Sequence, residues 1–144
     1  MSMRVCVIDG RGGGLGRRLV AGLHAELHGG QHKIIALATN AVAAEVMEQA
    51  GACCIGVGSE AIVRTVPTVD VIVTSLNLVL PGSMLGEVTP DVVHAILTAR
   101  AKKVLLPVNR AFVEVVGTED QTLDALIARS LSRVTSLVAA APQL

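Results

Sequence analysis

The sequence predicts an α/β protein: a doubly wound, three-layer Rossmann-like sandwich whose sheet is mostly parallel, with one antiparallel strand at its edge. Two observations lead to this fold class. Short apolar, β-branched runs alternate along the chain with segments of helical periodicity. The runs are apolar throughout, which is typical of parallel strands covered on both faces. Because 144 residues is the size of one domain, we expect a single domain at 1–138, with a frayed tail at 139–144.

The elements follow in chain order. Six apolar runs predict strands at 4–9, 33–39, 52–57, 69–75, 103–108 and 111–116. Between and after them, helical spacing predicts helices at 14–28, 41–50, 59–66, 90–101 and 119–138. Asn40, Ser59 and Thr89 are the expected N-caps, and Pro90 suits a first helical position. The connection Asn109-Arg110 is so short that it permits only a hairpin, which makes the sixth strand antiparallel.

Composition and charge exclude several classes of function. Twelve basic residues balance twelve acidic ones, and Phe112 is the only aromatic, so we expect no nucleic-acid binding. No apolar run approaches the length of a membrane span, and the N-terminus lacks a signal peptide, so we expect a cytoplasmic protein without membrane contact. Cys6, Cys53 and Cys54 form no disulfide framework. His24, His28 and His32 repeat every four residues, a spacing at which two side chains on one helix face can bind a metal. No Cys or carboxylate completes the set, so no metal is expected.

The most informative segment is the glycine-rich loop between the first strand and the first helix. Gly10, Gly14 and Gly16 follow the spacing G-x-x-x-G-x-G, which is the glycine spacing of short-chain dehydrogenases. A glycine loop that opens a helix offers free N–H groups and a positive dipole end to an anion. The expected cofactor-binding residues are Gly10, Arg11, Gly12, Gly13, Gly14, Gly16, Thr39 and Asn40. The alternative is a tight turn with no ligand.

The residues after the second strand bear on which nucleotide would bind. An NAD site usually carries an acidic residue there, to bond the ribose hydroxyls. This chain has Thr39-Asn40 instead, and Arg11 is placed to meet a 2′-phosphate, so NADP or another nucleotide is favoured over NAD. Asn40 is equally explained as a helix cap. No Gly-Lys-Ser/Thr follows the glycines, which excludes a Walker A loop.

Polar residues collect at the carboxyl ends of the predicted strands, where ligands of open α/β sheets bind. The expected substrate-binding residues are Asn77, Ser83, Glu87, Asn109 and Arg110. Any acid–base chemistry would fall to Glu87 or Asp9. The long loop 76–88 is either a lid or, through its apolar residues, a subunit contact. The last helix either packs on the sheet or forms a dimer face.

Four motifs carry a resemblance to a known family. They are Val-Ile-Asp-Gly-Arg-Gly-Gly-Gly-Leu-Gly, Ile-Ile-Ala-Leu-Ala-Thr-Asn-Ala, Ser-Met-Leu-Gly-Glu-Val-Thr-Pro and Leu-Leu-Pro-Val-Asn-Arg. The chain resembles a family of short bacterial Rossmann-like proteins of unknown function over 7–117. More widely, it is similar to NAD(P)-binding Rossmann domains. The resemblance implies the fold and a site at the glycine loop, but no reaction.

Three functions remain open on the sequence alone. The first is a homo-oligomeric protein that binds a phosphate-bearing small molecule, a nucleotide or dinucleotide, at the glycine loop. The second is a small enzyme whose site is shared between subunits; the Tyr-x-x-x-Lys pair of short-chain dehydrogenases is impossible, since the chain has no Tyr. The third is a ligand-sensing regulatory or interaction domain.

Overall fold

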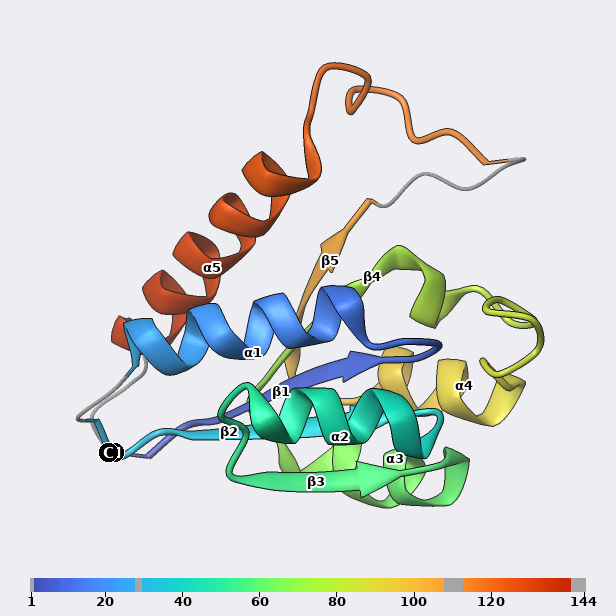
Figure 1. The fold of residues 1–144 in the computed structure, drawn as a ribbon, viewed down its shortest axis with the longest axis horizontal. Coiled ribbons are helices and arrows are strands. Elements are labelled where there is room, and N and C mark those ends of the chain that lie inside the picture. The colour runs from blue at the N-terminus through green and yellow to red at the C-terminus, as the bar shows by residue number, and fades with distance from the viewer. Residues whose placement is uncertain (1, 28–29, 108–112, 141–144) are drawn as a thin grey trace.

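A parallel sheet forms the middle layer of the protein (Figure 1). The computed structural model describes residues 2–27, 30–107 and 113–140. Within them the sheet has five strands in the order β3-β2-β1-β4-β5, all parallel. The strands are β1 (Arg4–Asp9), β2 (Lys33–Ala38), β3 (Cys54–Val57), β4 (Val71–Ser75) and β5 (Lys102–Leu106).

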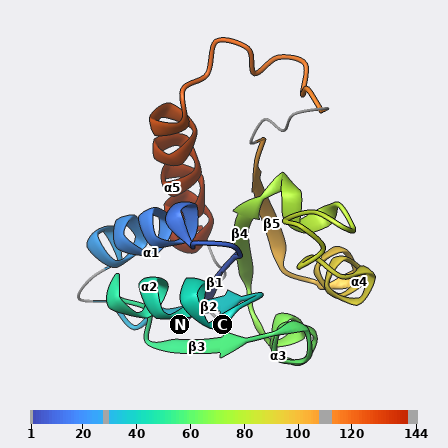
Figure 2. The ribbon, with the colours of Figure 1, turned by 45° about the vertical axis from the view of Figure 1, so that its right-hand side comes forward.

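Helices cover both faces of this sheet (Figures 1 and 2). One face carries α1 (Gly14–Glu26), α2 (Ala41–Gln49) and α5 (Leu123–Ala139). The other carries α3 (Ser59–Thr65) and α4 (Pro90–Thr98), with 3₁₀ turns η1 (Val66–Thr68) and η2 (Leu76–Val79). The predicted three-layer α/β sandwich is therefore confirmed.

The central strand β1 shows how the sequence produces these layers. Successive side chains of a strand point to opposite faces. Val5 and Val7 accordingly pack under α1, α2 and α5, whereas Cys6 and Ile8 pack under α3 and α4, and all four are at most 1% exposed. Burying each such side chain contributes about 1.5–3 kcal/mol to folding. This is why the run is apolar throughout.

The strand order places a switch point between β1 and β4. The chain runs outward from β1 through β2 to β3, then returns to the other side of β1 to form β4. The helices that connect β1 to β2 and β2 to β3 therefore cover one face of the sheet, and those that connect β3 to β4 and β4 to β5 cover the other. This change of face opens a crevice beyond the carboxyl ends of β1 and β4. Asp9 and Ser75 are the last residues of these two strands.

The expected antiparallel edge strand is wrong. Residues 111–112 lie outside the described part of the chain, and over 113–116 there is no strand, so among the described residues the sheet ends at β5. Val113 and Val116 are 39% and 90% exposed. Their apolar side chains resemble a strand in the sequence, but no layer of the protein covers them. Residues 113–122 instead form a loop that extends away from the sheet (Figure 2).

Two of the three expected N-caps are confirmed. Asn40 accepts a hydrogen bond from the amide of Ala43 at 2.9 Å, and Thr89 accepts one from the amide of Val92 at 3.3 Å. Ser59 is not a cap, because it is the first residue of α3 itself. The last helix begins at Leu123 rather than 119, after Thr122, which accepts from the amide of Ala125 at 3.1 Å.

None of the described helices combines the length and the apolar character needed to cross a bilayer.

The cap of α5 can be tested by mutation. Thr122→Ala removes the acceptor of the Ala125 amide, so we expect the free energy of unfolding to fall by about 0.5–2 kcal/mol in urea denaturation. Ser132→Ala is the matched control: it removes an exposed hydroxyl from the middle of the same helix, where Ala favours the helix. Equal stability of Thr122→Ala and the wild type would contradict a helix start at Leu123.

Candidate functional site

A cleft of about 190 Å³ lies beyond the carboxyl ends of β1 and β4, at the switch point of the sheet. This is where open α/β sheets bind their ligands. Three segments form its walls: the glycine loop, the end of β4 with η2, and the loop that follows. The lining residues are Asp9, Gly10, Arg11, Gly12, Gly13, Gly14, Leu15, Ser75, Asn77 and Met84.

Asp9 gives the glycine loop its shape. Its side chain is 5% exposed, and its two oxygens accept hydrogen bonds from the amides of Gly10, at 2.8 Å, and Gly16, at 2.6 Å. Burial raises the pKa of Asp9, the two amide bonds lower it, and the negative charge of Glu87 raises it again. The carboxylate therefore joins the two ends of the loop, and both of its oxygens have partners within the protein.

The packing of the chain explains three of the loop glycines. A Cβ on Gly10 would lie 2.5 Å from Thr39 Oγ1 and 2.6 Å from Met84 Sδ, and Gly13 and Gly16 are the other two. Gly13 has a φ of 73°, and a Cβ added to it would lie 2.9 Å from the Cα of Ala43. A Cβ on Gly16 would lie 2.8 Å from the Cβ of Asp9, so this glycine lets α1 approach β1 closely. Both positions are explained by backbone conformation and helix–strand contact.

Gly12 and Gly14 are different. A Cβ on either would have no other atom within 4 Å, and neither residue has a positive φ. Nothing in the packing of the chain itself therefore requires glycine at these positions. Both line the cleft at the N-terminus of α1, whose cap residue Gly13 offers no side-chain acceptor. Space without side chains beside a helix N-terminus suits the close approach of an anion.

A second carboxylate, Glu87, lies against the other side of the loop. Its Oε1 accepts three hydrogen bonds: from Thr39 Oγ1 at 2.5 Å, from Asn40 Nδ2 at 2.8 Å and from the amide of Arg11 at 3.2 Å. The bonds from Thr39 and Asn40 lower the pKa of Glu87, burial opposes them, and the Arg11 amide and charge add to the lowering. Glu87 is thus held as an anion beside the end of β2.

Asn40 caps a helix and also joins two loops of the chain. Its Oδ1 accepts from the amide of Ala43 and caps α2. Its Nδ2 donates to the carbonyl oxygen of Arg11, at 2.9 Å, and to Glu87. One side chain therefore starts a helix and also connects the glycine loop to the loop after β4.

The segment that carries Glu87 is folded tightly. The amide of Gly82 donates to the carbonyl of Val88 at 2.8 Å, and Val88 is fully buried. Met84 and Leu85 have φ values of 56°, a conformation that costs about 1–3 kcal/mol for a non-glycine residue. Met84 is also a wall of the cleft, while Leu85 is 87% exposed. The loop 76–88 thus uses most of its apolar side chains within its own subunit.

Most of the expected site residues come together. Asp9, Asn77 and the glycines at 10, 12, 13 and 14 line the cleft with Arg11, and Thr39, Asn40 and Glu87 form the cluster beside Gly10. Ser83 is buried but does not line the cleft. Gly16 does not line it either, and packs against Asp9 and Met47. Asn109 and Arg110 lie outside the described residues. Among the residues described, Asn77 Oδ1 is the buried side-chain atom without a hydrogen-bond partner.

Three lining residues were not among the expected site residues: Leu15, Ser75 and Met84. Ser75 could have been found, because it is the last residue of a strand beside the switch point. Leu15 and Met84 carry no chemical signal in the sequence, and their place depends on how the loops fold over the sheet.

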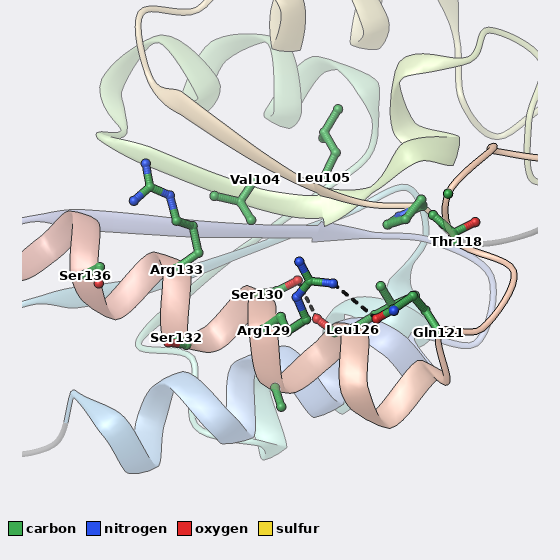
Figure 3. A pocket seen from close by; sticks show the side chains of 13 residues that line it. Val104, Leu105, Thr118, Gln121, Leu126, Arg129, Ser130, Ser132, Arg133 and Ser136 are labelled. Atoms are coloured by element: carbon green, nitrogen blue, oxygen red, sulfur yellow. Dashed lines mark hydrogen bonds between the residues drawn. The ribbon is translucent and has the colours of Figure 1, made fainter.

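A larger hollow of about 800 Å³ lies elsewhere, between the edge strand β5 and α5 (Figure 3). Arg129 and Arg133 rise from α5 on the side of β5, and Arg129 donates to Gln121 at 3.2 Å. In the described chain β5 is the last strand of the sheet on this side. We favour the smaller cleft as the site, because it combines the switch point, the open glycines and the unpartnered amide oxygen of Asn77.

The described residues contain no group of three or more His, Cys, Asp or Glu side chains that could hold a metal ion. The two carboxylates of the site, Asp9 and Glu87, are each held by hydrogen-bond donors instead.

Fold and site together define an α/β protein with a Rossmann-like sheet and a glycine-rich cleft at its switch point. Comparison with protein families matches residues 4–139 to the domain of unknown function DUF3842. The chain belongs to this family. No curated protein and no solved structure matches it.

The charge of Glu87 can be tested through pH. Its pKa is lowered from the ordinary 4.5, so the stability it contributes is present above that pH and is lost as pH falls below it. Glu87→Gln keeps an oxygen acceptor for the three donors but carries no charge. We therefore expect the stability advantage of the wild type over this variant to shrink between about pH 5 and about pH 3 in urea denaturation.

Glu60→Gln is the control for this experiment. The side chain of Glu60 is 93% exposed and lies 3.9 Å from Arg64, so it loses only a surface ion pair of little value. If the wild type and Glu87→Gln stay separated by a constant free energy across this range, the carboxylate is not stabilised by its donors.

Proposed function

We propose that the protein binds a nucleotide or dinucleotide and holds its phosphate at the glycine loop. The observation that carries the proposal is the pair Gly12 and Gly14, where glycine is required neither by backbone conformation nor by contacts of the chain itself. Five glycines between Gly10 and Gly16 cost conformational entropy on folding. Close approach of a phosphate to the loop would explain that cost.

The dimensions of the cleft support a phosphate rather than a whole ligand inside it. Complete small-molecule pockets usually enclose about 300–1,000 Å³. The cleft, at about 190 Å³, suits the phosphate groups, with the rest of the ligand lying over the surrounding surface. Asn77 lines the cleft, and its buried Oδ1 has no hydrogen-bond partner among the described residues. NADP, expected from Arg11, is one member of this class.

The structure gives no observation in favour of an enzyme over a binding protein. Asp9 shapes the loop with both oxygens, and Glu87 accepts from three donors. These bonds account for both carboxylates without a catalytic role. The shared-site enzyme and the regulatory domain stay predictions, as does the cytoplasmic location.

The proposal is tested by thermal unfolding in the presence of ADP, NAD and NADP. A ligand that binds the native state must raise the melting temperature. We expect at least one of the three to raise the Tm of the wild type. Gly12→Ala should abolish most of the increase, because its methyl group enters the cleft, while its own stability changes by no more than about 0.5 kcal/mol.

Gln49→Ala is the control, since Gln49 is exposed at the far end of α2. It should respond to ligand as the wild type does. The proposal fails if none of the three nucleotides changes the Tm of the wild type at millimolar concentration.

We further propose that the protein is a homo-oligomer that pairs through β3. This strand is an edge of the sheet, and its Ile55 and Val57 are 40% and 45% exposed. An exposed apolar edge strand is a template for another strand, and a second copy offers the same edge in antiparallel direction. By contrast α5, the alternative contact, buries Ile127, Val134 and Val138 against its own sheet.

Light scattering tests this arrangement. We expect the wild type to have at least twice the 14.8 kDa mass of one chain, and Val57→Lys to have the mass of one chain, because a charged side chain on an edge blocks strand pairing. Val116→Lys, at a 90% exposed loop position, should leave the mass of the wild type unchanged. A monomeric wild type would exclude the contact.

A further inference from the structure

We propose that Glu87 is the specificity-determining residue of the site: its carboxylate binds the hydroxyls of an unphosphorylated ribose, and so selects NAD or ADP over nucleotides with a 2′-phosphate. The inference rests on the proposed function, because it concerns the ribose next to the phosphate held by the glycine loop. It differs from the expectation of NADP drawn from the sequence.

The end of β2 has no acidic residue of its own. In dinucleotide-binding sheets an acidic residue at this point bonds the ribose hydroxyls. Here β2 ends at Ala38 and is followed by Thr39 and Asn40, which are not acidic. These are the two residues whose side chains hold the carboxylate of Glu87, at 2.5 and 2.8 Å. The acid that β2 lacks is therefore supplied in space by the loop after β4.

The carboxylate also lies at the right place relative to the phosphate site. A Cβ added to Gly10, the first loop glycine, would lie 3.3 Å from Glu87 Oε1. The amide of Arg11, the next residue, donates to the same oxygen. The same Cβ would lie 2.5 Å from Thr39 Oγ1 and 2.6 Å from Met84 Sδ, so these side chains cover Gly10. The carboxylate therefore lies directly beside the loop that would hold the phosphate, and a ribose attached to that phosphate would meet it next to the covered Gly10.

The charge of Glu87 makes the site discriminate. All three described bonds end on Oε1, and Oε2 takes part in none of them. A ribose hydroxyl is a donor and would form a charge-assisted hydrogen bond with the carboxylate. A 2′-phosphate has no such proton at neutral pH and carries about −1.5 to −2 charges, so it would be repelled.

Glu87 is in position before any ligand arrives. Its segment is closed by backbone bonds from Gly82 to Val88 and from Val88 to Ser83, at 2.8 and 3.2 Å, and Val88 and Ser83 are both buried. A carboxylate fixed in advance costs little ordering entropy on binding.

The test compares ligands that differ only in the 2′-phosphate: NAD with NADP, measured by isothermal titration calorimetry. We expect the wild type to bind NAD at least about tenfold more tightly than NADP. In Glu87→Gln this preference should fall by about tenfold or more, with weaker binding of NAD and tighter binding of NADP. Asp91→Asn, which neutralises an exposed carboxylate on α4, should keep the preference of the wild type.

The outcomes separate this inference from the function beneath it. If neither nucleotide binds and ADP does not bind either, the proposed function fails and the inference fails with it. If the wild type binds NADP as tightly as NAD, the function stands and the inference is overturned. The same holds if Glu87→Gln binds both ligands more tightly by one factor, since Glu87 would then only block the site. The wild-type preference decides the matter even if Glu87→Gln does not fold.

Discussion

The buried carboxylate of Asp9 is the interaction on which the rest of the site depends. It lies at the end of the central strand and accepts hydrogen bonds from Gly10 and Gly16, the first and last glycines of the loop. A buried charge is costly unless donors surround it, and these amides are its donors. The loop must therefore bend around Asp9. That bend points the N-terminus of α1 at the cleft and leaves Gly12 and Gly14 facing open space.

Glu87 completes the arrangement by joining three segments that are far apart in the chain. Its partners are Arg11, Thr39 and Asn40, from 47 to 76 residues away. The negative charge of Glu87 raises the pKa of Asp9, because two like charges repel each other. Both are nonetheless accommodated, because each has its own set of donors. One carboxylate, Asp9, thus lines the cleft and shapes the loop, and the other, Glu87, lies beside the loop at the end of β2.

Much of the fold could be predicted because its signals are local. The five parallel strands follow from continuous apolar runs, and Asn40 and Thr89 were recognisable as caps because the capping bond itself is made to the first turn of the helix that follows. The sixth strand failed for the opposite reason. The apolar residues at 113–116 have the composition of a strand, but a strand needs a partner and a covering layer, and Val116 is exposed. The prediction that Ser59 caps α3 was wrong, because Gly58, with a φ of 94°, occupies the cap position and Ser59 is already in the helix.

The sequence by itself determined the five parallel strands, the presence of the five α-helices, the glycine loop after β1 and the family, since each depends on residue spacing along the chain. Only the tertiary structure decided which glycines the protein needs for its own packing, and where Glu87 lies. Strand order brings the loop after β4 to the end of β2, beside Gly10. Spacing cannot encode that contact, because it depends on how the whole chain winds about β1. The residues that follow β2 in the sequence are therefore not acidic, but the acidic residue Glu87 lies beside them in the folded protein.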